Sequence, residues 1–182
     1  KRGAEVRVFI RDESQFPALK ALGAKDFYVG NLDSESALKA ALAGMDKVLH
    51  IGPPMHPRET EITGMLTAAA ASEGIKHFIY YSVMHPLRRE VRHHRLKLDA
   101  EEHLIESGLT YTIVQPSRYM QHLVPLWKTV LDEGVHSMPF SADKKFNVVD
   151  LEDLAEASAI VATEPGHEFA IYELAGPEAL SQ

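Results

Sequence analysis

Residues 77–83, HFIYYSV, and residues 110–116, TYTIVQP, are two runs rich in β-branched and aromatic residues. Between them lies a segment, 93–107, whose apolar residues recur at the spacing of an amphipathic helix. Strands separated by a helix of this length are typical of βαβ units, in which the two strands are parallel. This stretch therefore predicts a parallel sheet with helices packed against it.

The same alternation extends in both directions along the chain. Further strands are predicted at 5–11, 25–30, 46–52 and 170–176, helices at 14–23, 33–44, 58–73 and 119–133, and a strand followed by a helix within 144–166. The result is an α/β fold with a doubly wound, Rossmann-like parallel sheet. Ligands of such sheets bind beyond the carboxyl ends of the strands, so the candidate site residues lie there.

The dinucleotide-binding motif Gly-x-Gly-x-x-Gly does not occur in the sequence. The opening residues, KRGAEVRV (1–8), resemble the end of a first helix that leads into a second strand. We therefore expect that a first strand, its glycine turn and a helix, roughly 20–25 residues, are missing before residue 1. The alternative is a sheet with another strand order and no missing strand.

The composition excludes several classes of protein. The 182 residues carry a net charge of −7, and the one locally basic segment, HPLRREVRHHR (85–95), is short, which argues against direct nucleic-acid binding. There is no cysteine, so neither disulfides nor thiolate chemistry can contribute. No apolar run reaches the roughly 18 residues that a membrane span requires. A cytoplasmic protein with no membrane contact is expected.

Polar residues at the predicted strand ends suggest a dinucleotide site. Arg11 follows the second strand of a complete fold, where an arginine suits the 2′-phosphate of NADP and an acidic residue suits NAD. Taken alone, it is as easily explained as a surface arginine. Asn31 and Leu32 could lie near an adenine ring, although GNLDS (30–34) is also an ordinary helix start capped by Asp33 or Ser34.

The segment RHHRLKL (92–98) places His93 and Lys97 four residues apart, on one face of a helix. A hydride-transfer site needs a proton donor and a cation that orients the cofactor ribose. Lys97 is the candidate cation and His93 the candidate acid, with His94 and His85 as competitors. Ser82 could orient the substrate. The alternative is that these are exposed residues of an amphipathic helix.

Two other interpretations are weaker. A metal site could be suggested by the closeness in sequence of His85, His93, His94, His103 and Glu101. His94 and His103 are nine residues apart, which is not a helix-face repeat, and no His-Glu-x-x-His motif occurs, so no metal is expected. The Tyr80–Tyr81 pair is better explained by core packing than by cofactor contact.

A resemblance to a known family covers most of the chain from Glu5 to Gly176. The sequence resembles the NmrA-like family of atypical short-chain dehydrogenases/reductases in the runs VRVFIRD (6–12), GNLDS (30–34), VLHIGPP (48–54), FIYYSV (78–83), YTIVQPSRYMQ (111–121) and VVDLEDLAEA (148–157). It implies a Rossmann core that binds NADP(H), with NAD(H) less favoured, and a small C-terminal substrate lobe. The core is expected at 1–116 and the lobe mostly at 117–182, with 146–163 returning to the core.

The resemblance also implies roles for individual residues. Arg11 would contact the adenosine 2′-phosphate, and Asn31 and Leu32 would line the adenine. The middle of the cofactor would be bordered by Ile51, Gly52 and Pro53. The nicotinamide ribose would be contacted by Ser82, Val83 and Lys97. The nicotinamide ring would be covered by Pro116, Ser117 and Tyr119.

The sequence departs from the family at three places. The glycine motif is absent, Asn31 stands where the family has an aspartate, and the tyrosine of the Tyr-x-x-x-Lys motif is replaced by His93. The last departure leaves cofactor binding intact but weakens the case for carbonyl reduction by a tyrosine acid.

Three functions follow as hypotheses. The favoured one is an NADP(H)-dependent oxidoreductase acting on a small carbonyl, quinone or enone. The second is a non-catalytic NADP(H)-binding redox sensor or transcriptional regulator. The third, a sugar-nucleotide epimerase or dehydratase, ranks last because Tyr-x-x-x-Lys is not intact. The substrate identity is left open, and the macromolecular partners considered are a second copy of the chain in a homodimer or a regulatory protein.

Overall fold

The computed structural model describes residues 2–138 and 140–181. Its main sheet contains four parallel strands in the order β3-β4-β5-β8, formed by Lys47–His50, His77–Tyr81, Tyr111–Pro116 and Ala170–Leu174. The two strands from which the fold was predicted, β4 and β5, are neighbours at its centre, and every residue of β4 is buried. The predicted parallel α/β sheet is confirmed.

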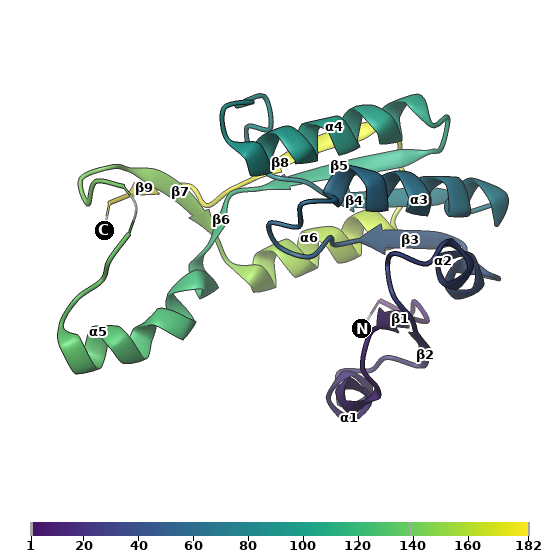
Figure 1. Ribbon diagram of the computed structural model, residues 1–182, viewed down its shortest axis with the longest axis horizontal. Helices are drawn as coiled ribbons and strands as arrows, with labels where there is room; N and C mark the ends of the chain where they lie inside the picture. The colour runs from purple at the N-terminus through teal and green to yellow at the C-terminus, as the bar shows by residue number, and fades with distance from the viewer. Residues whose placement is uncertain (1, 139, 182) are drawn as a thin grey trace.

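A second, smaller sheet pairs β1 (Arg7–Ile10) with β2 (Asp26–Val29), also in parallel. Among the described residues, β1 pairs only with β2 and β3 pairs only with β4, so each of these two strands has one unpaired edge. Figure 1 shows the small sheet beside the β3 side of the main sheet. Leu49 and Ile51, at and just after the end of β3, are 42% and 58% exposed. In a doubly wound sheet this position, between the second and fourth strands, belongs to the first strand; the strand expected before residue 1 stays a prediction.

Helices cover both faces of the main sheet (Figure 1). On one face lie α2 (Glu35–Leu42), α3 (Glu59–Ser72) and α4 (Arg92–Glu106), around a core that includes Leu38, Ala70, Phe78 and Leu104. On the other lies α6 (Leu151–Thr163), around a core that includes Ile79, Val114 and Leu154. Tyr80 belongs to the first core and Tyr81 to the second, which confirms that this pair packs in the interior.

The first core also joins the two sheets. Phe9 of β1 packs against the same cluster as Leu38 and Leu42 of α2. The Arg7 guanidinium donates to the carbonyls of Ala41 and Ala43 at 3.0 and 2.9 Å, where it satisfies two backbone acceptors at the end of α2. Because α2 in turn packs on α3, the small sheet is held to the main one through helices rather than through strand pairing.

Helix ends follow local chemistry. Ser34 accepts a hydrogen bond from the Ala37 N–H and caps α2, and Asp150 accepts one from the Glu152 N–H and caps α6. The helix predicted at 14–23 is a 3₁₀ turn (Glu13–Gln15) followed by α1 (Phe16–Ala21), whose second residue is Pro17. Proline is tolerated there because the first N–H groups of a helix have no intrahelical partner.

The helix predicted at 119–133 is wrong in its first half. Residues Arg118–Tyr119 form β6, Met120–Leu126 form a 3₁₀ helix, and only Trp127–Glu133 form an α-helix, α5. Pro125 explains the difference, because it has no N–H to donate and its ring crowds the preceding turn of an α-helix.

A third sheet stands beside the main one and contains β6, β7 (Phe146–Val149) and β9 (Ala179–Leu180). With α5 it forms the part that extends away from the main sheet in Figure 1. The part of the chain after residue 116 therefore contains both this extension and two elements of the main body: β8, which is a strand of the main sheet, and α6, which packs on that sheet. The division at residue 116 stays a prediction.

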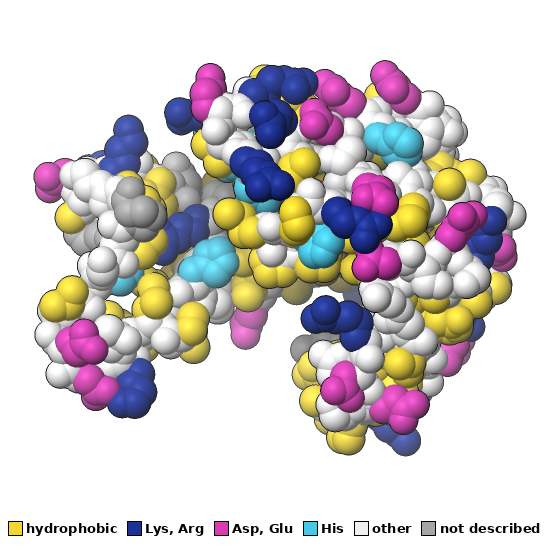
Figure 2. Space-filling view, in the orientation of Figure 1, with side chains coloured by type: hydrophobic (Ala, Val, Ile, Leu, Met, Phe, Trp, Pro, Cys, Tyr) yellow, Lys and Arg dark blue, Asp and Glu magenta, His cyan; other side chains and the backbone are white. Residues whose placement is uncertain are grey.

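The surface carries charges of both signs. Figure 2 shows basic and acidic side chains on the same face, and a deep indentation between the α5 region and the β1–β2 region. In the part of the chain that the structure describes, no helix has the length and apolarity needed to cross a membrane.

Candidate cofactor and active site

The carboxyl ends of β3, β4 and β5 lie side by side because the three strands are parallel neighbours. They bring together three short segments predicted to bind the cofactor, which begin with Ile51, Ser82 and Pro116. Backbone hydrogen bonds fix the second and third against one another: the Ser82 N–H donates to the Val114 carbonyl and the Met84 N–H to the Pro116 carbonyl, at 2.8 and 2.9 Å. This edge is the natural ligand-binding edge of such a sheet.

Lys97 of α4 reaches this edge from the side. Its ammonium donates to the Tyr81 carbonyl at 2.8 Å and to the Glu59 carboxylate at 2.6 Å, and it lies 4.9 Å from the centre of the Tyr80 ring. The side chain is only 7% exposed. Burial lowers the pKa of Lys97, while the negative charges of Glu59 and Glu101 oppose that shift. Lys97 is therefore a buried cation at the carboxyl end of β4.

Glu59 comes from the first turn of α3 and is 2% exposed. Its Oε1 accepts hydrogen bonds from both Lys97 and the Tyr80 hydroxyl, the latter at 2.8 Å. Burial raises the pKa of the Tyr80 hydroxyl, and the charge of Glu59 adds to the shift, so Tyr80 acts here as a neutral donor. Gly52 leaves space for this carboxylate, because a Cβ at position 52 would lie 2.6 Å from either carboxylate oxygen.

A second carboxylate, Glu101, lies one turn beyond Lys97 on α4. The Gln115 amide of β5 donates to both of its oxygens at 3.0 Å. Burial raises the pKa of Glu101, and the Ser82 hydroxyl, the Gln115 amide and the Lys97 ammonium oppose the shift. Lys97 and Glu101 thus share the buried face of α4, as their spacing of four residues predicts.

The three candidate histidines lie at or just before the start of α4, and none of them is fully buried. His93 is half-buried at the start of α4, and burial followed by the charges of Lys97 and His94 lowers its pKa. His94 is held through its Nδ1 by the His85 carbonyl at 2.9 Å, and His85 itself is exposed with a φ of 56°. In the described structure none of these three histidines forms a hydrogen bond with Lys97. The positive charge of Lys97 acts on His93, so the structure keeps His93 as the candidate acid.

Three buried oxygens along this edge lack a hydrogen-bond partner among the described residues: Glu59 Oε2, Ser82 Oγ and Ser117 Oγ. The Ser82 hydroxyl lies beside the Glu101 carboxyl and lowers its pKa without forming a hydrogen bond of ordinary geometry. Buried polar groups in native proteins are nearly always satisfied, so these three oxygens call for polar partners that a water molecule or a ligand would supply. The hydroxyls and amide of a nicotinamide nucleoside would fit this need.

The other predicted residues are more dispersed. Arg11, at the end of β1, is exposed, and Asn31 is exposed with its side chain accepting from the Asp33 N–H at 3.2 Å. Leu32 packs against the first core. Ile51 is exposed, Pro53 and Val83 are partly buried, and Pro116 is buried in the main sheet. Tyr119 is partly buried in β6, where burial raises the pKa of its hydroxyl.

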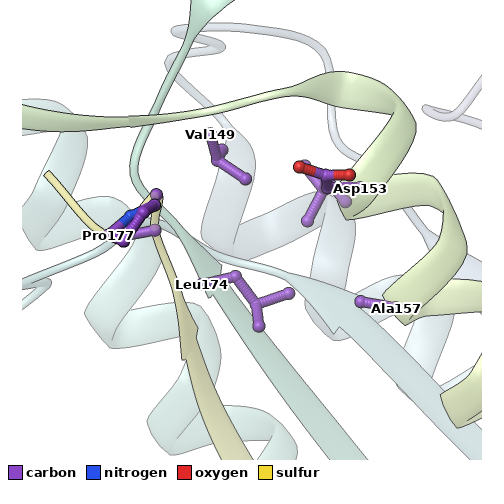
Figure 3. A pocket seen from close by; sticks show the side chains of 8 residues that line it. Val149, Asp153, Ala157, Leu174 and Pro177 are labelled. Atoms are coloured by element: carbon purple, nitrogen blue, oxygen red, sulfur yellow. The ribbon is translucent and has the colours of Figure 1, made fainter.

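The described structure also contains hollows away from Lys97. One, of about 180 Å³, lies between β7, α6 and the segment after β8, and its wall includes Val149, Asp153, Leu174 and Pro177 (Figure 3). Asp153 is its only charged side chain. Among residues 2–138 and 140–181, no three histidine or carboxylate side chains converge as a metal site would require.

Both the sequence and the fold of this chain match those of known proteins. Residues 1–130 match a family of NAD(P)H-binding domains. The chain belongs to this NAD(P)H-binding family. The narrower assignment to the NmrA-like group stays a prediction.

Two proteins similar in sequence to this chain bear the names of reductases. The chain is 31% identical to an NAD(P)H azoreductase of Xenophilus azovorans over 176 residues, 96% of this chain and 60% of the relative. It is 32% identical to quinone oxidoreductase 2 of Escherichia coli over 167 residues, 88% of this chain and 56% of the relative. The chain thus spans less than two thirds of the length of either relative.

Solved structures give the same result for the fold. An NADPH-dependent quinone oxidoreductase from Escherichia coli, crystallised with NADPH, superposes with a TM-score of 0.87 at 26% identity and covers all of this chain and 63% of that one. A triphenylmethane reductase of Citrobacter, complexed with NADP(H), superposes with a TM-score of 0.83 at 23% identity over 96% of this chain and 62% of that one. The Rossmann-like fold is thereby confirmed.

Sequence reasoning missed Glu59, Tyr80 and Gln115 as polar members of this site. Glu59 is the first residue of α3 and reads as a favourable first-turn acid, and Tyr80 reads as a core residue. A usable signal was present for Gln115, because an amide inside the apolar run TYTIVQP must find a partner when it is buried. No local pattern identifies Glu59, whose partner is 38 residues away.

Proposed function

We propose that the protein is an NADPH-dependent reductase whose acceptors are quinones or similar planar conjugated compounds. The observation that carries the proposal is the buried Lys97 ammonium, hydrogen-bonded to the carboxyl end of β4, near the buried Ser82 and Ser117 hydroxyls that have no hydrogen-bond partner among the described residues. The names of the azoreductase and quinone oxidoreductase relatives support the acceptor class.

The residues of the chain divide the work of binding. Arg11 is placed to bind the 2′-phosphate, because it ends the strand that precedes the adenosine end of such sites and its guanidinium is exposed. Asn31 and Leu32 would line the adenine. Lys97 and Ser82 would hold the nicotinamide ribose, and Ser117 and Tyr119 would lie over the nicotinamide ring, since these segments follow β4 and β5.

The acceptor class follows from the missing tyrosine acid. Bound NADPH would supply a hydride, which together with one proton converts a quinone into a hydroquinone. Reduction of an isolated ketone concentrates charge on one oxygen and requires a positioned acid, whereas a quinone spreads the charge over its ring. His93 has a lowered pKa and is mostly neutral near pH 7, so a site that relies on it suits acceptors with a small demand for a bound acid.

The test is calorimetric titration of the full-length protein with NADPH and with NADH, followed by NADPH oxidation assays with benzoquinones, naphthoquinones, azo dyes and simple aldehydes. The proposal predicts tighter binding of NADPH and turnover of quinones or azo dyes in preference to aldehydes. Binding without turnover of any acceptor would instead support the redox-sensor function, and absence of nucleotide binding would overturn the proposal.

A further inference from the structure

Among the described residues, the Lys97 ammonium has two hydrogen-bond acceptors, which leaves one of its N–H groups without an acceptor. An ammonium carries three N–H donors, and the Glu59 carboxylate and the Tyr81 carbonyl accept two of them, at 2.6 and 2.8 Å. Two acceptors at fixed positions set the direction of the third donor. One acceptor is backbone and cannot vary with sequence, so Glu59 is the side chain that determines where the ammonium points.

The Glu59 carboxylate is itself held in place. Tyr80 donates to the same oxygen that Lys97 contacts, and the helical backbone of α3 fixes the Cα of Glu59. On its other side the carboxylate lies so close to Gly52 that a Cβ there would come within 2.6 Å. The Glu59 carboxylate therefore lies against the segment that follows β3. Its Oε1 accepts a hydrogen bond from Lys97, and its Oε2 has no partner among the described residues.

We propose that Glu59 is a positioning residue, whose carboxylate aims the Lys97 ammonium at the nicotinamide ribose of the bound cofactor. This inference rests on the proposed function, because it assigns a second residue to the same site. As a consequence, cofactor affinity depends on helix α3, although α3 contains none of the predicted cofactor contacts.

The environment of Lys97 makes the inference testable by pH. Burial disfavours the ammonium, and a neighbouring carboxylate favours it. The titratable groups that face Lys97 come from every element packed around it, and they are His50 of β3, Glu59 of α3, Tyr80 of β4, and His93 and Glu101 of α4. Of these, Glu59 alone forms a salt bridge with the ammonium. Its removal should lower the pH at which Lys97 loses its proton.

The experiment measures NADPH affinity from pH 6 to 10 in the full-length protein and in Glu59→Gln, Lys97→Met and the double variant. Glu61→Gln is the matched control, because Glu61 lies on the same helix but pairs with Arg58 at the surface. We expect Glu59→Gln to weaken NADPH binding at neutral pH by about tenfold, as one charge-assisted hydrogen bond warrants. Its loss of affinity at alkaline pH should begin at lower pH than in the parent protein.

The double variant separates positioning from a general structural effect. If Glu59 acts through Lys97, then Glu59→Gln adds no further loss of affinity in the Lys97→Met background. The inference is overturned if the two losses multiply in the double variant, or if Glu59→Gln binds NADPH with the affinity and pH profile of the parent protein.

Other outcomes point to different failures. A parent protein that does not bind NADPH contradicts the proposed function itself, whatever the variants do. Should Glu59→Gln fail to fold, Glu59→Asp keeps the charge but is one methylene shorter, and it should weaken NADPH binding severalfold while the alkaline limb stays in place. A Glu59→Asp variant that binds NADPH as the parent protein does would equally overturn the inference.

Discussion

Glu59 and Lys97 form a salt bridge of 2.6 Å between the first turn of α3 and the middle of α4, with side chains that are 1% and 7% exposed. The pair joins two helices that also share a hydrophobic core and a hydrogen bond from the Thr60 hydroxyl to the Leu96 carbonyl. Removing two charges from water is costly, so such a pair is weak evidence for stability and better evidence for function.

Removing one charge of this pair should destabilise the fold far more than removing both. Glu59→Gln leaves a buried ammonium without its anion, and Lys97→Met leaves a buried carboxylate without its cation. Each should lower the free energy of unfolding by about 3–5 kcal/mol, whereas the double variant should recover most of that loss. Urea denaturation of the four proteins at pH 7 measures these differences.

Glu61→Gln again provides the control, because its partner Arg58 is at the surface and exposed ion pairs contribute little. A double variant whose loss equals the sum of the two single losses would show that the charges stabilise the fold independently of one another.

Gly52→Ala should impair both stability and cofactor binding. The added Cβ would lie 2.6 Å from the oxygens of Glu59, so the carboxylate or the segment after β3 must move. Overpacking of this kind typically costs about 1–3 kcal/mol. The measurement is the same denaturation together with NADPH titration. In a Glu59→Ala background the clash is absent, and there Gly52→Ala should cost little; an equal cost in both backgrounds would contradict the explanation.

Arg11→Ala should change the choice between the two nicotinamide cofactors. If its guanidinium binds the 2′-phosphate, its loss should weaken NADPH binding roughly 10- to 100-fold and leave NADH binding unchanged. Lys20→Ala, an exposed cation on α1, controls for the general effect of charge. If Arg11→Ala weakened the binding of NADPH and NADH equally, Arg11 would not be the residue that recognises the 2′-phosphate.

Much of the fold was predictable because its signals are local. The runs that became β4 and β5 are long, apolar and β-branched, and the helix between them has the right spacing of apolar residues. One exception was the 3₁₀ segment before α5, where Pro125 outweighed a helical pattern of apolar residues.

The site was less predictable because it depends on distant residues. Lys97 was identified from its place on α4, and the structure does bring it to the carboxyl end of β4. Glu59, by contrast, follows the segment PPMHP (53–57), which offers no functional pattern, and only the packing of α3 on α4 joins it to Lys97. Such a pairing is a tertiary fact, which the sequence near either residue does not contain.

His50 should make stability depend on pH in a defined window. It is 4% exposed, and burial lowers the pKa of its imidazole from 6.5 to about 4. Between these two pH values the imidazole binds a proton in the unfolded chain but not in the folded protein. The contribution of His50 to the free energy of unfolding therefore rises with pH from about 4 to 6.5 and is constant above. The shift corresponds to roughly 3 kcal/mol between the ends of the window.

Urea denaturation at half-unit steps from pH 4 to 7.5 measures this contribution as the difference between the parent protein and His50→Gln. Glutamine can still pair with the Thr63 hydroxyl, which lies 3.3 Å from His50 Nε2, but it does not titrate. The parent protein should therefore lose more stability than the variant as the pH falls through 6.5, and His122→Gln, at an exposed position, should follow the parent protein. Parallel curves for the parent and His50→Gln would mean that the buried imidazole accepts its proton in the folded state as readily as in the unfolded chain.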